Sequence, residues 1–253
     1  MAEMTFLTNF SRAAGSYDAN ARVQALAARE LLSRSRGDAS DRILELGCGT
    51  GLYTRMLLES FPNAAIRAID ASEKMVAVAR EQITSPRVSF SCADAETFTT
   101  GSYHLMTSNA SLHWFRDLAG TLVNLQAMLD DGGVLTFSYF GPNTYRELQE
   151  SLRQVVGPSV ALTCSSFLSV AEITGLLDGV FRTCRVEKLE CQEHFDSLRD
   201  LLSNIKLTGT RGAGLIPKIT WTPGLLRILE STYIERFGEI RVTYQFYICR
   251  AEK

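Results

Sequence analysis

The sequence predicts an α/β fold in which a mostly parallel sheet carries helices on its faces. Strand-like and helix-like patterns alternate through the first 140 residues, which favours parallel strands joined by crossover helices. A glycine-rich turn, Gly47–Gly51, directly follows the first apolar run, and short polar residues follow the later runs. Such sheets bind their ligands at the carboxyl ends of the strands, so these features mark one functional edge.

Residues 41–140 contain the regular part of this pattern. Their helices show apolar residues at helical spacing, and Ser72 is a suitable N-cap for the second of them. The sequence DDGG after Met128 and Leu129 is expected to stop the third helix. Strands are expected at residues 42–47, 64–70, 87–94, 103–109 and 134–140, and helices at 52–61, 72–83 and 118–129.

The two ends of the chain are richer in helix. The first 35 residues carry apolar side chains at positions 23, 26, 27, 31 and 32, one face of a helix. After Gly141 and Pro142 one strand-like run, 181–195, lies among helical stretches, and the alternating run 240–253 suits an edge strand. The later helices are expected at 144–156, 169–177, 197–207 and 222–237.

Composition fits a single globular domain. The 253 residues are 45% hydrophobic and carry a formal net charge of −2, which gives no sign of a nucleic-acid or membrane-surface partner. No window approaches the roughly 18 apolar residues of a membrane-spanning helix, and the first residues lack the pattern of a secretory signal. We expect a cytoplasmic protein without nucleic-acid or membrane partners. The six cysteines form no CxxC pair or Cys/His cluster, so we expect reduced thiols and no metal site.

The glycine turn has the spacing G-x-G-x-G. This is one residue tighter than the dinucleotide fingerprint, and no Gly-Lys-Ser/Thr follows, so the turn is not a P-loop. Glycines allow positive φ and let a ligand lie against the main chain. The alternative is an ordinary strand-to-helix turn.

Polar side chains at three further strand ends favour a ligand. Asp70 follows the glycines by about 20 residues, where a carboxylate can accept hydrogen bonds from both hydroxyls of a ribose. Asp94, beside Ala95, is placed to receive an adenine amino group, and Asn109 ends the fourth strand. The pattern predicts an adenosine ligand without a pyrophosphate. The ligand is also suited to carry a cation. Glu45 and Asp70 supply negative charge, and aromatic faces come from Tyr17, Trp114 and Tyr139.

The stretches "ILELGCGTG", "AID", "CADAE" and "SNASLHWF" resemble those of the class I S-adenosylmethionine-dependent methyltransferases. The resemblance covers about the first 140 residues. It implies a Rossmann-like, seven-stranded sheet whose strand seven is antiparallel, with residues 242–251 as the candidate, and S-adenosyl-L-methionine as cofactor. The cofactor-binding residues that it implies are Glu45, Gly47, Cys48, Gly49, Gly51, Asp70, Ala71, Met75, Asp94, Ala95 and Asn109.

Further stretches from end to end of the chain resemble a narrower family, the malonyl-[acyl-carrier-protein] O-methyltransferases of biotin synthesis. Among them are "FSRAAGSYDANARVQALAARELL", "FGPNTYRELQES" and "LLSNIKLTGTRGA". This resemblance implies methylation of the free carboxyl of a malonyl thioester carried on acyl carrier protein, as a step toward pimelate. It implies one methyltransferase domain, 1–253, made of an N-terminal helical lid (1–35), a cofactor-binding core (41–140), and cap helices with the last strands (141–253).

The proposed chemistry needs no general base. A malonyl carboxylate is ionised at pH 7 and can attack the methyl group directly, and no Ser/His/Asp or Cys/His arrangement stands out. His104 and His194 lie in strand-like runs and are expected to be structural. His113 follows Asn109 and either lines the active site, orienting the acceptor carboxylate, or packs beside Trp114; members of the narrower family often carry Gln there.

Tyr17 and His113 are the candidate catalytic residues. The resemblance places Tyr17 in the lid over the cofactor; the alternative is a tyrosine packed on the core. Gln24 lies seven residues later on the same helical face and is a candidate for closing the site.

A cationic segment is the candidate acceptor site. Residues 201–229 contain Lys206, Arg211, Lys218 and Arg227 and no acid. Lys206 and Arg211 are candidates for binding a substrate carboxylate or the thioester, or for docking an acidic carrier protein. The alternative is a solvated helix face.

Two other functions stay open. One is a methyltransferase for another small carboxylic acid, such as an aconitate-like substrate, which needs no carrier-protein surface. The other is a non-catalytic S-adenosylmethionine-binding module that acts by contacting a partner.

Overall fold

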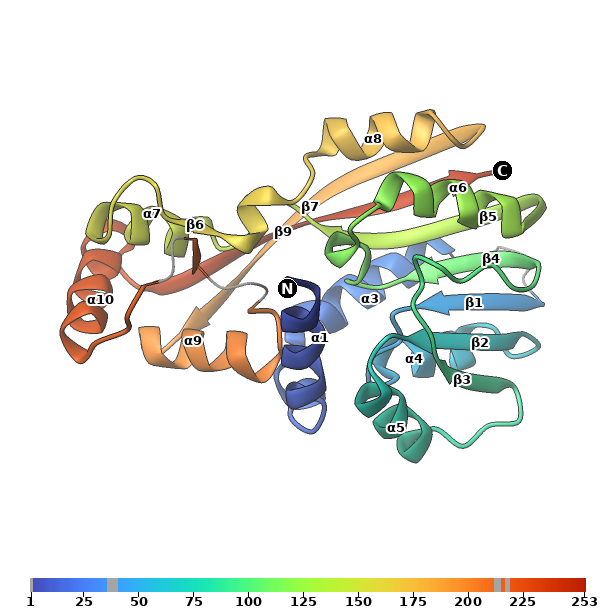
Figure 1. The fold of residues 1–253 in the computed structure, drawn as a ribbon, viewed down its shortest axis with the longest axis horizontal. Helices are drawn as coiled ribbons and strands as arrows, with labels where there is room; N and C mark the ends of the chain where they lie inside the picture. Colours follow the sequence, from blue (N-terminus) through green and yellow to red (C-terminus); the bar gives the residue numbers. More distant parts are fainter. Residues whose placement is uncertain (1, 36–40, 212–214, 217–218) are drawn as a thin grey trace.

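The structure, a computed structural model, describes residues 2–35, 41–211, 215–216 and 219–253. A seven-stranded sheet in the order β3-β2-β1-β4-β5-β9-β7 forms its centre (Figure 1). Strands β1 to β5 are parallel, and β9 is antiparallel to both β5 and β7. The strands are β1 (Arg42–Leu46), β2 (Ala65–Asp70), β3 (Val88–Cys92), β4 (Tyr103–Ser108), β5 (Leu129–Phe140), β7 (Thr183–Phe195) and β9 (Ile240–Glu252). The predicted Rossmann-like α/β fold is confirmed.

Ten α-helices surround the sheet in the described part of the chain. They are α1 (Ala2–Ala13), α2 (Tyr17–Asn20), α3 (Arg22–Ser35), α4 (Leu52–Ser60), α5 (Glu73–Gln82), α6 (Leu118–Met128), α7 (Arg146–Val155), α8 (Val170–Asp178), α9 (Leu198–Leu207) and α10 (Pro223–Phe237). Two short 3-10 helices, η1 (Leu112–Trp114) and η2 (Thr163–Ser166), and a small sheet of β6 (Ala161–Leu162) with β8 (Leu215–Ile216) complete the fold. None of the described helices is both long and apolar enough to cross a membrane.

Side chains alternate between two core layers, one on each face of the sheet. Ile43 belongs to the layer that also contains α3, α4, α7 and α10, whereas its neighbour Leu44 belongs to the layer with α6 and α8. Successive residues of a strand point to opposite faces, so a parallel strand that is covered on both faces is buried throughout. This explains why residues 43–46 are all buried.

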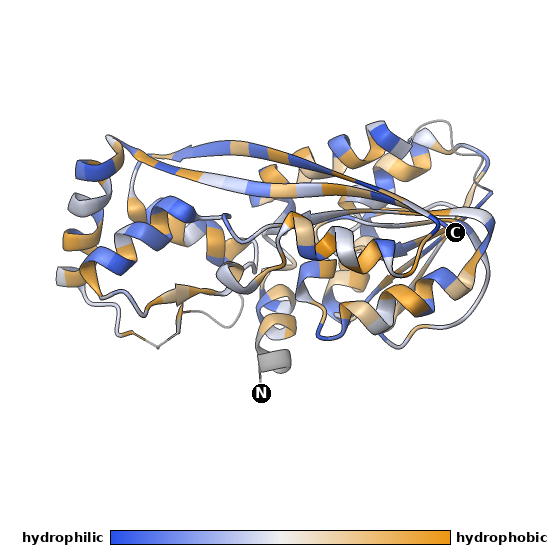
Figure 2. Cartoon of the chain, turned by 90° about the horizontal axis from the view of Figure 1, so that it is seen from above, coloured by the Kyte–Doolittle hydropathy of each residue, from blue (hydrophilic) through white to orange (hydrophobic). Residues whose placement is uncertain are grey.

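The last two long strands extend beyond the central sheet. β7 and β9 pair over thirteen residues and connect the core to a group of elements at the other end of the molecule (Figures 1 and 2). We call this group, α7, β6, β8, α9 and α10, the cap. The helix α1 lies between the cap and the core, in contact with both α5 and α9.

Two sequence expectations about strands are wrong. The closing strand, β9, is not an edge strand: it lies between β5 and β7, and β7 is the edge. Both faces of β9 are buried, which apolar and small residues permit although the run alternates in part. The fifth strand also begins at Leu129, because the DDGG segment is extended and joins β5 instead of a separate turn.

Candidate functional site

The glycine turn after β1 is held tightly against its neighbours. Gly47 and Gly51 have φ of +70° and +87°, and a Cβ would lie 2.2 Å from Ser111 Oγ at the first and 2.6 Å from Ile83 Cδ1 at the second. Any side chain would therefore clash as well as strain the backbone. The backbone N–H groups of Gly47 and Cys48 donate to Ile69 O, at 2.8 and 3.0 Å, which fixes the turn to the end of β2.

The Asp70 carboxylate organises the same edge. Its Oδ2 accepts a hydrogen bond from Gly49 N at 2.9 Å, and its Oδ1 accepts one from Ser72 N at 2.8 Å. Burial raises the pKa of Asp70, while these two backbone hydrogen bonds act to lower it. Each carboxylate oxygen keeps a further lone pair for a ligand hydroxyl.

A cavity lies against this turn, and eight of the predicted cofactor residues line it. We call it the glycine-turn cavity. Gly47 and Gly49 of the turn line it together with Asp70, Ala71 and Met75 from the end of β2 and the start of α5. The remaining three follow β3 and β4, and they are Asp94, Ala95 and Asn109.

Asn109 and Asp94 are themselves held by hydrogen bonds. Asn109 accepts from Ser138 Oγ at 2.7 Å and donates to Gln24 O at 3.1 Å, so its amide is fixed between β5 and α3. Asp94 Oδ1 accepts from Glu96 N at 2.9 Å, and its side chain is 43% exposed. Such fixed polar groups orient a ligand at little entropic cost.

Three predicted cofactor residues do not line this cavity: Glu45, Cys48 and Gly51. Glu45 is 1% exposed and accepts a hydrogen bond from Thr54 Oγ1 at 2.6 Å. Burial raises the pKa of Glu45 to about 8. The carboxyl lies behind the turn, so direct contact with a cationic ligand stays a prediction.

The N-terminal helices contribute side chains that the sequence analysis missed. Phe6 and Phe10 of α1 line the glycine-turn cavity and contact Trp114, with ring centroids 6.0 Å apart in a stacked pair and 5.6 Å apart in an edge pair. Apolar residues at helical spacing are ordinarily core residues. The sequence therefore offers no signal for this role beyond the two aromatic residues themselves. Sequence alone does not indicate which face such a helix covers.

Tyr17, a predicted catalytic residue, lines the glycine-turn cavity rather than the second cavity described below. Burial and the nearby Asp70 charge raise the pKa of its hydroxyl, which stays protonated. The next residue, Asp18, accepts a hydrogen bond from Thr50 Oγ1 and pairs with Arg55 at 3.1 Å. These contacts attach α2 to the glycine turn.

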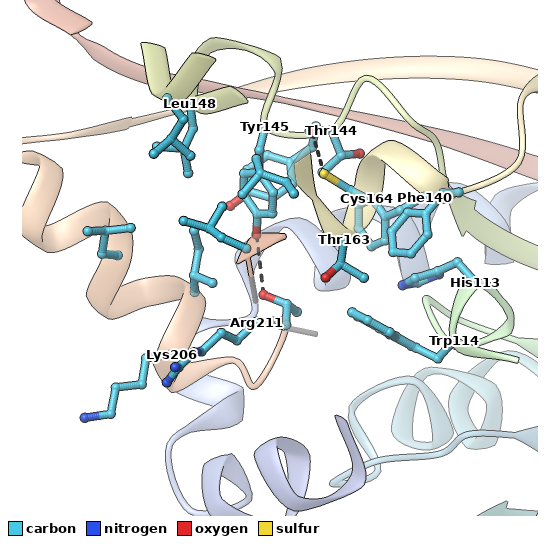
Figure 3. A pocket seen from close by; sticks show the side chains of 18 of the residues that line it. His113, Trp114, Phe140, Thr144, Tyr145, Leu148, Thr163, Cys164, Lys206 and Arg211 are labelled. Atoms are coloured by element: carbon cyan, nitrogen blue, oxygen red, sulfur yellow. Dashed lines mark hydrogen bonds between the residues drawn. The ribbon is translucent and has the colours of Figure 1, made fainter. Parts of the chain in front are cut away.

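A second, larger cavity of about 530 Å³ lies under the cap, and we call it the cap cavity (Figure 3). Its walls are mainly apolar, and α7, α9 and α10 each contribute to them. His113 and Trp114 lie at one end and the Lys206 and Arg211 head groups at the other (Figure 3). Trp114 lines both cavities, so this tryptophan marks the place where they meet.

His113 is packed in an aromatic cluster at that junction. Its ring lies 4.9 to 5.6 Å from the rings of Trp114, Tyr139, Phe140 and Phe167, and the residue is 8% exposed. Burial lowers the pKa of His113 to about 3. The imidazole is therefore neutral at pH 7 and serves as a poor base. His113 packs beside Trp114 and also lines the cap cavity; its role in orienting an acceptor carboxylate stays a prediction.

Two buried nitrogens at the junction have no hydrogen-bond partner: His113 Nδ1 and Trp114 Nε1. Unpaired buried polar groups are uncommon in folded proteins, and a catalytic role or a bound water or ion is among their explanations. Gln24, which the sequence singled out, is 5% exposed and lines the same cavity. His104 and His194, expected to be structural, lie in β4 and β7 and line neither cavity.

The predicted acceptor residues lie at the exposed end of the cap cavity. Lys206 and Arg211 are exposed and line it, and within the described ranges neither head group forms an ion pair or hydrogen bond. Arg227 is exposed on α10 but does not line the cavity. Lys218 lies outside the described residues.

Backbone strain occurs beside both cavities. Ala110, at φ +53°, lines the glycine-turn cavity, and Tyr145, at φ +60°, lines the cap cavity. They are the two described non-glycine residues with positive φ. Strained residues tend to cluster at functional sites. Among the described residues no cluster of His, Cys, Asp and Glu has the arrangement of a metal site.

Known proteins resemble this chain in sequence. A family model described as "Methyltransferase domain" matches residues 43–133. Malonyl-[acyl-carrier protein] O-methyltransferase of Bacillus cytotoxicus is 35% identical, across 96% of this chain and 90% of that protein. The protein of the same name from Acetivibrio thermocellus is 34% identical, across 97% and 92%.

Solved structures share the fold at lower sequence identity. The YcgJ protein of Bacillus subtilis superposes with a TM-score of 0.62 at 15% identity, covering 90% of this chain and 97% of that one. Phosphoethanolamine N-methyltransferase 2 of Haemonchus contortus, in complex with S-adenosyl-L-methionine, superposes with a TM-score of 0.57 at 16% identity, covering 88% and 51%. At such identities the likeness supports the fold alone.

Proposed function

Since the chain belongs to the malonyl-[acyl-carrier protein] O-methyltransferase family of class I methyltransferases, we propose that it methylates the free carboxyl of a malonyl thioester. The carrier of that thioester is acyl carrier protein, and the product is a malonyl methyl ester. The observation that carries the proposal is the meeting of two cavities at Trp114, one at the glycine turn and one under the cap.

The methyl donor of this family is S-adenosyl-L-methionine, which supplies an electrophilic methyl group on a positively charged sulfur. The side chains of the glycine-turn cavity fit such a molecule. Asp70 retains acceptor capacity for ribose hydroxyls, and Asp94, Ala95 and Asn109 line the same cavity, where Asp94 would accept a hydrogen bond from the adenine amino group. The ring faces of Trp114 and Phe6 suit a sulfonium cation.

The acceptor carboxylate would bind at the junction end of the cap cavity. A carboxylate is ionised at pH 7 without help, so the protein needs donors that orient it rather than a base. His113 is neutral and supplies one N–H, and the unpaired Trp114 Nε1–H supplies another. His113 is therefore proposed to position the acceptor rather than to remove a proton.

Rate enhancement would come from alignment and exclusion of water. Attack by a carboxylate on a methyl sulfonium neutralises two opposite charges, and this is faster in a dry, fixed geometry. The N-terminal helices would supply the cover, since Phe6, Phe10 and Tyr17 line the glycine-turn cavity. Residues 1–35 are thus proposed to act as the lid, over the core 41–140, with 141–253 forming the acceptor side.

The test is methyl transfer from labelled S-adenosylmethionine to three acceptors. Malonyl on acyl carrier protein is expected to yield a base-labile methyl ester, and malonyl-coenzyme A and aconitate are the comparisons. Label on aconitate alone would remove the malonyl assignment while keeping the carboxyl methyltransferase chemistry. Tight cofactor binding with no label on any acceptor would favour a non-catalytic binding module.

A further inference from the structure

The cap cavity has a charged end that the reaction itself does not need. In the proposed reaction the methyl group is transferred beside Trp114, because this residue lines both cavities. Lys206 and Arg211 lie at the opposite end of the cap cavity from Trp114 (Figure 3). The reacting carboxylate and these two cations are therefore not partners.

The wall of the cap cavity between its two ends is unfavourable for a charged part of a ligand. Leu148 and Leu152 of α7 and Leu202 and Ile205 of α9 are among the apolar residues that line it. Burying an unpaired charge along such a wall is very costly. A ligand that fills the cavity is therefore uncharged in its middle part, whatever it carries at its ends.

The cations at the mouth are available to an anion. Lys206 and Arg211 are exposed and make no ion pair within the described part of the chain. The whole segment 201–229 has four cations and no acid, although the chain as a whole has a net charge of −2. Such a local excess of one sign attracts the opposite sign. The side-chain types suit a phosphate, which Arg grips with two hydrogen bonds and Lys meets as a point charge.

Size also favours a ligand longer than a malonyl group. A cavity of about 530 Å³ lies in the range that holds drug-sized ligands, roughly 300–1,000 Å³, whereas a malonyl group has only three carbons. The space beyond the reacting end must accommodate whatever bears that group.

We infer that Lys206 and Arg211 form a phosphate subsite, which binds the phosphate at the distal end of the phosphopantetheine arm that bears the malonyl group. This inference rests on the proposed function. The long, uncharged arm would occupy the apolar middle of the cap cavity, with its thioester toward His113 and its phosphate at the mouth. The same phosphate occurs in the arm of acyl carrier protein and in coenzyme A.

The test compares malonyl-phosphopantetheine with malonyl-pantetheine, which differ only in the phosphate. With the unaltered protein we expect the phosphorylated thioester to have the higher kcat/KM, by about 10- to 100-fold, as for a charge-assisted hydrogen-bond pair. Lys206→Met and Arg211→Met should each reduce this ratio, and the double variant should bring it near 1. Arg227→Met removes a cation of the same segment outside the cavity and should leave the ratio unchanged.

Each other outcome identifies a different role. An equal loss of kcat/KM on both thioesters would overturn the subsite. Lys206 and Arg211 would then act at the malonyl end or have a structural role. Losses on malonyl-acyl carrier protein alone, with the free phosphopantetheine thioester unaffected, would overturn it in favour of carrier docking. Losses on malonyl-coenzyme A as well as on the carrier would show that both sources use the subsite. If no malonyl thioester is methylated, the proposed function falls, and the subsite falls with it.

Discussion

His113 and Glu45 illustrate how burial, the largest cause of both pKa shifts, changes the charge of single residues near this site. Burial lowers the pKa of His113 to about 3 and raises the pKa of Glu45 to about 8. At pH 7 the imidazole is neutral and the carboxyl is mainly protonated in the cofactor-free chain. The proposed acceptor side thus presents a neutral imidazole, while a titratable acid lies behind the glycine turn.

The pH dependence of stability provides a test of the His113 environment. Between pH 6.5 and about 3 the unfolded chain binds a proton at position 113 that the folded chain does not, so the free energy of unfolding decreases by about 1.4 kcal/mol for each unit that the pH is lowered. The contribution is complete above pH 6.5 and is lost below it. Urea unfolding at pH 7.5 and pH 5 should therefore show a smaller loss for His113→Gln than for the unaltered protein.

Glu45 has the opposite effect on the pH dependence of stability. Its folded pKa is raised, so its contribution is complete below about pH 4.5 and is lost as the pH rises toward 8. The comparison of variant with unaltered protein removes this shared background. Identical pH slopes for the two proteins would contradict the buried, neutral state of His113.

Asp70 is the single residue on which cofactor binding should depend most. Asp70→Ala removes the proposed acceptor for ribose hydroxyls and the two hydrogen bonds that hold Gly49 and Ser72. We expect a loss of cofactor affinity on the order of 1–3 kcal/mol, measured by calorimetry with S-adenosylhomocysteine. Asp131→Ala, at an exposed position in β5, is the control, and an unchanged affinity in Asp70→Ala would rule out the ribose contact.

At the scale of elements, α5 connects the cofactor edge to the first helix. The Ser72 hydroxyl accepts a hydrogen bond from Met75 N as the N-cap of α5, which confirms the predicted cap. It also lies 2.8 Å from the hydroxyl of Ser11 in α1. One side chain therefore stabilises a helix start and attaches the N-terminal helix to the core.

Two serine N-caps separate these effects. Ser72→Ala and Ser169→Ala each remove a cap hydrogen bond, the second from the capping box of α8, and each should cost about 1 kcal/mol of unfolding free energy. Only Ser72→Ala should also weaken S-adenosylhomocysteine binding, because α1 covers the glycine-turn cavity. Equal cofactor affinities in the two variants would mean that the Ser11 contact does not hold α1 in place.

At the scale of the whole molecule, the N-terminal helix and the cap meet at Gly209. This residue follows α9 with φ of +70°, and a Cβ there would lie 3.0 Å from Phe10 Cα and 3.1 Å from Asn9 O. Phe10 lines the glycine-turn cavity, while α9 supplies Lys206 and a wall of the cap cavity. The close approach at Gly209 thus links the two cavities through α1.

A matched pair of glycines tests this link. Gly209→Ala and Gly238→Ala both place alanine at positive φ, and each should lose about 1–2 kcal/mol of stability from backbone strain. Gly238 has no atom within 4 Å of the added Cβ, so its variant reports strain alone. Gly209→Ala should also displace α1 and weaken S-adenosylhomocysteine binding in calorimetry; equal affinities in both variants would contradict the link.

What the sequence determined by itself is local. The glycine turn, Asp70 at a strand end and the Ser72 cap follow from backbone conformation and hydrogen bonding within a few residues, so their patterns are readable along the chain. The alternation of strand-like and helix-like runs likewise predicted the parallel sheet. The side-chain period and the geometry of crossover helices leave few ways to arrange such strands.

What only the tertiary structure decided is the pairing of distant segments. The position of β9 between β5 and β7 depends on which strands bury its two faces, and an alternating run does not encode that choice. The cover by Phe6 and Phe10 and the long apolar cap cavity also depend on contacts between elements far apart in sequence. An apolar side chain looks the same in the sequence whether it fills the core or lines a cavity, because burial is a property of the packed molecule and not of the residue.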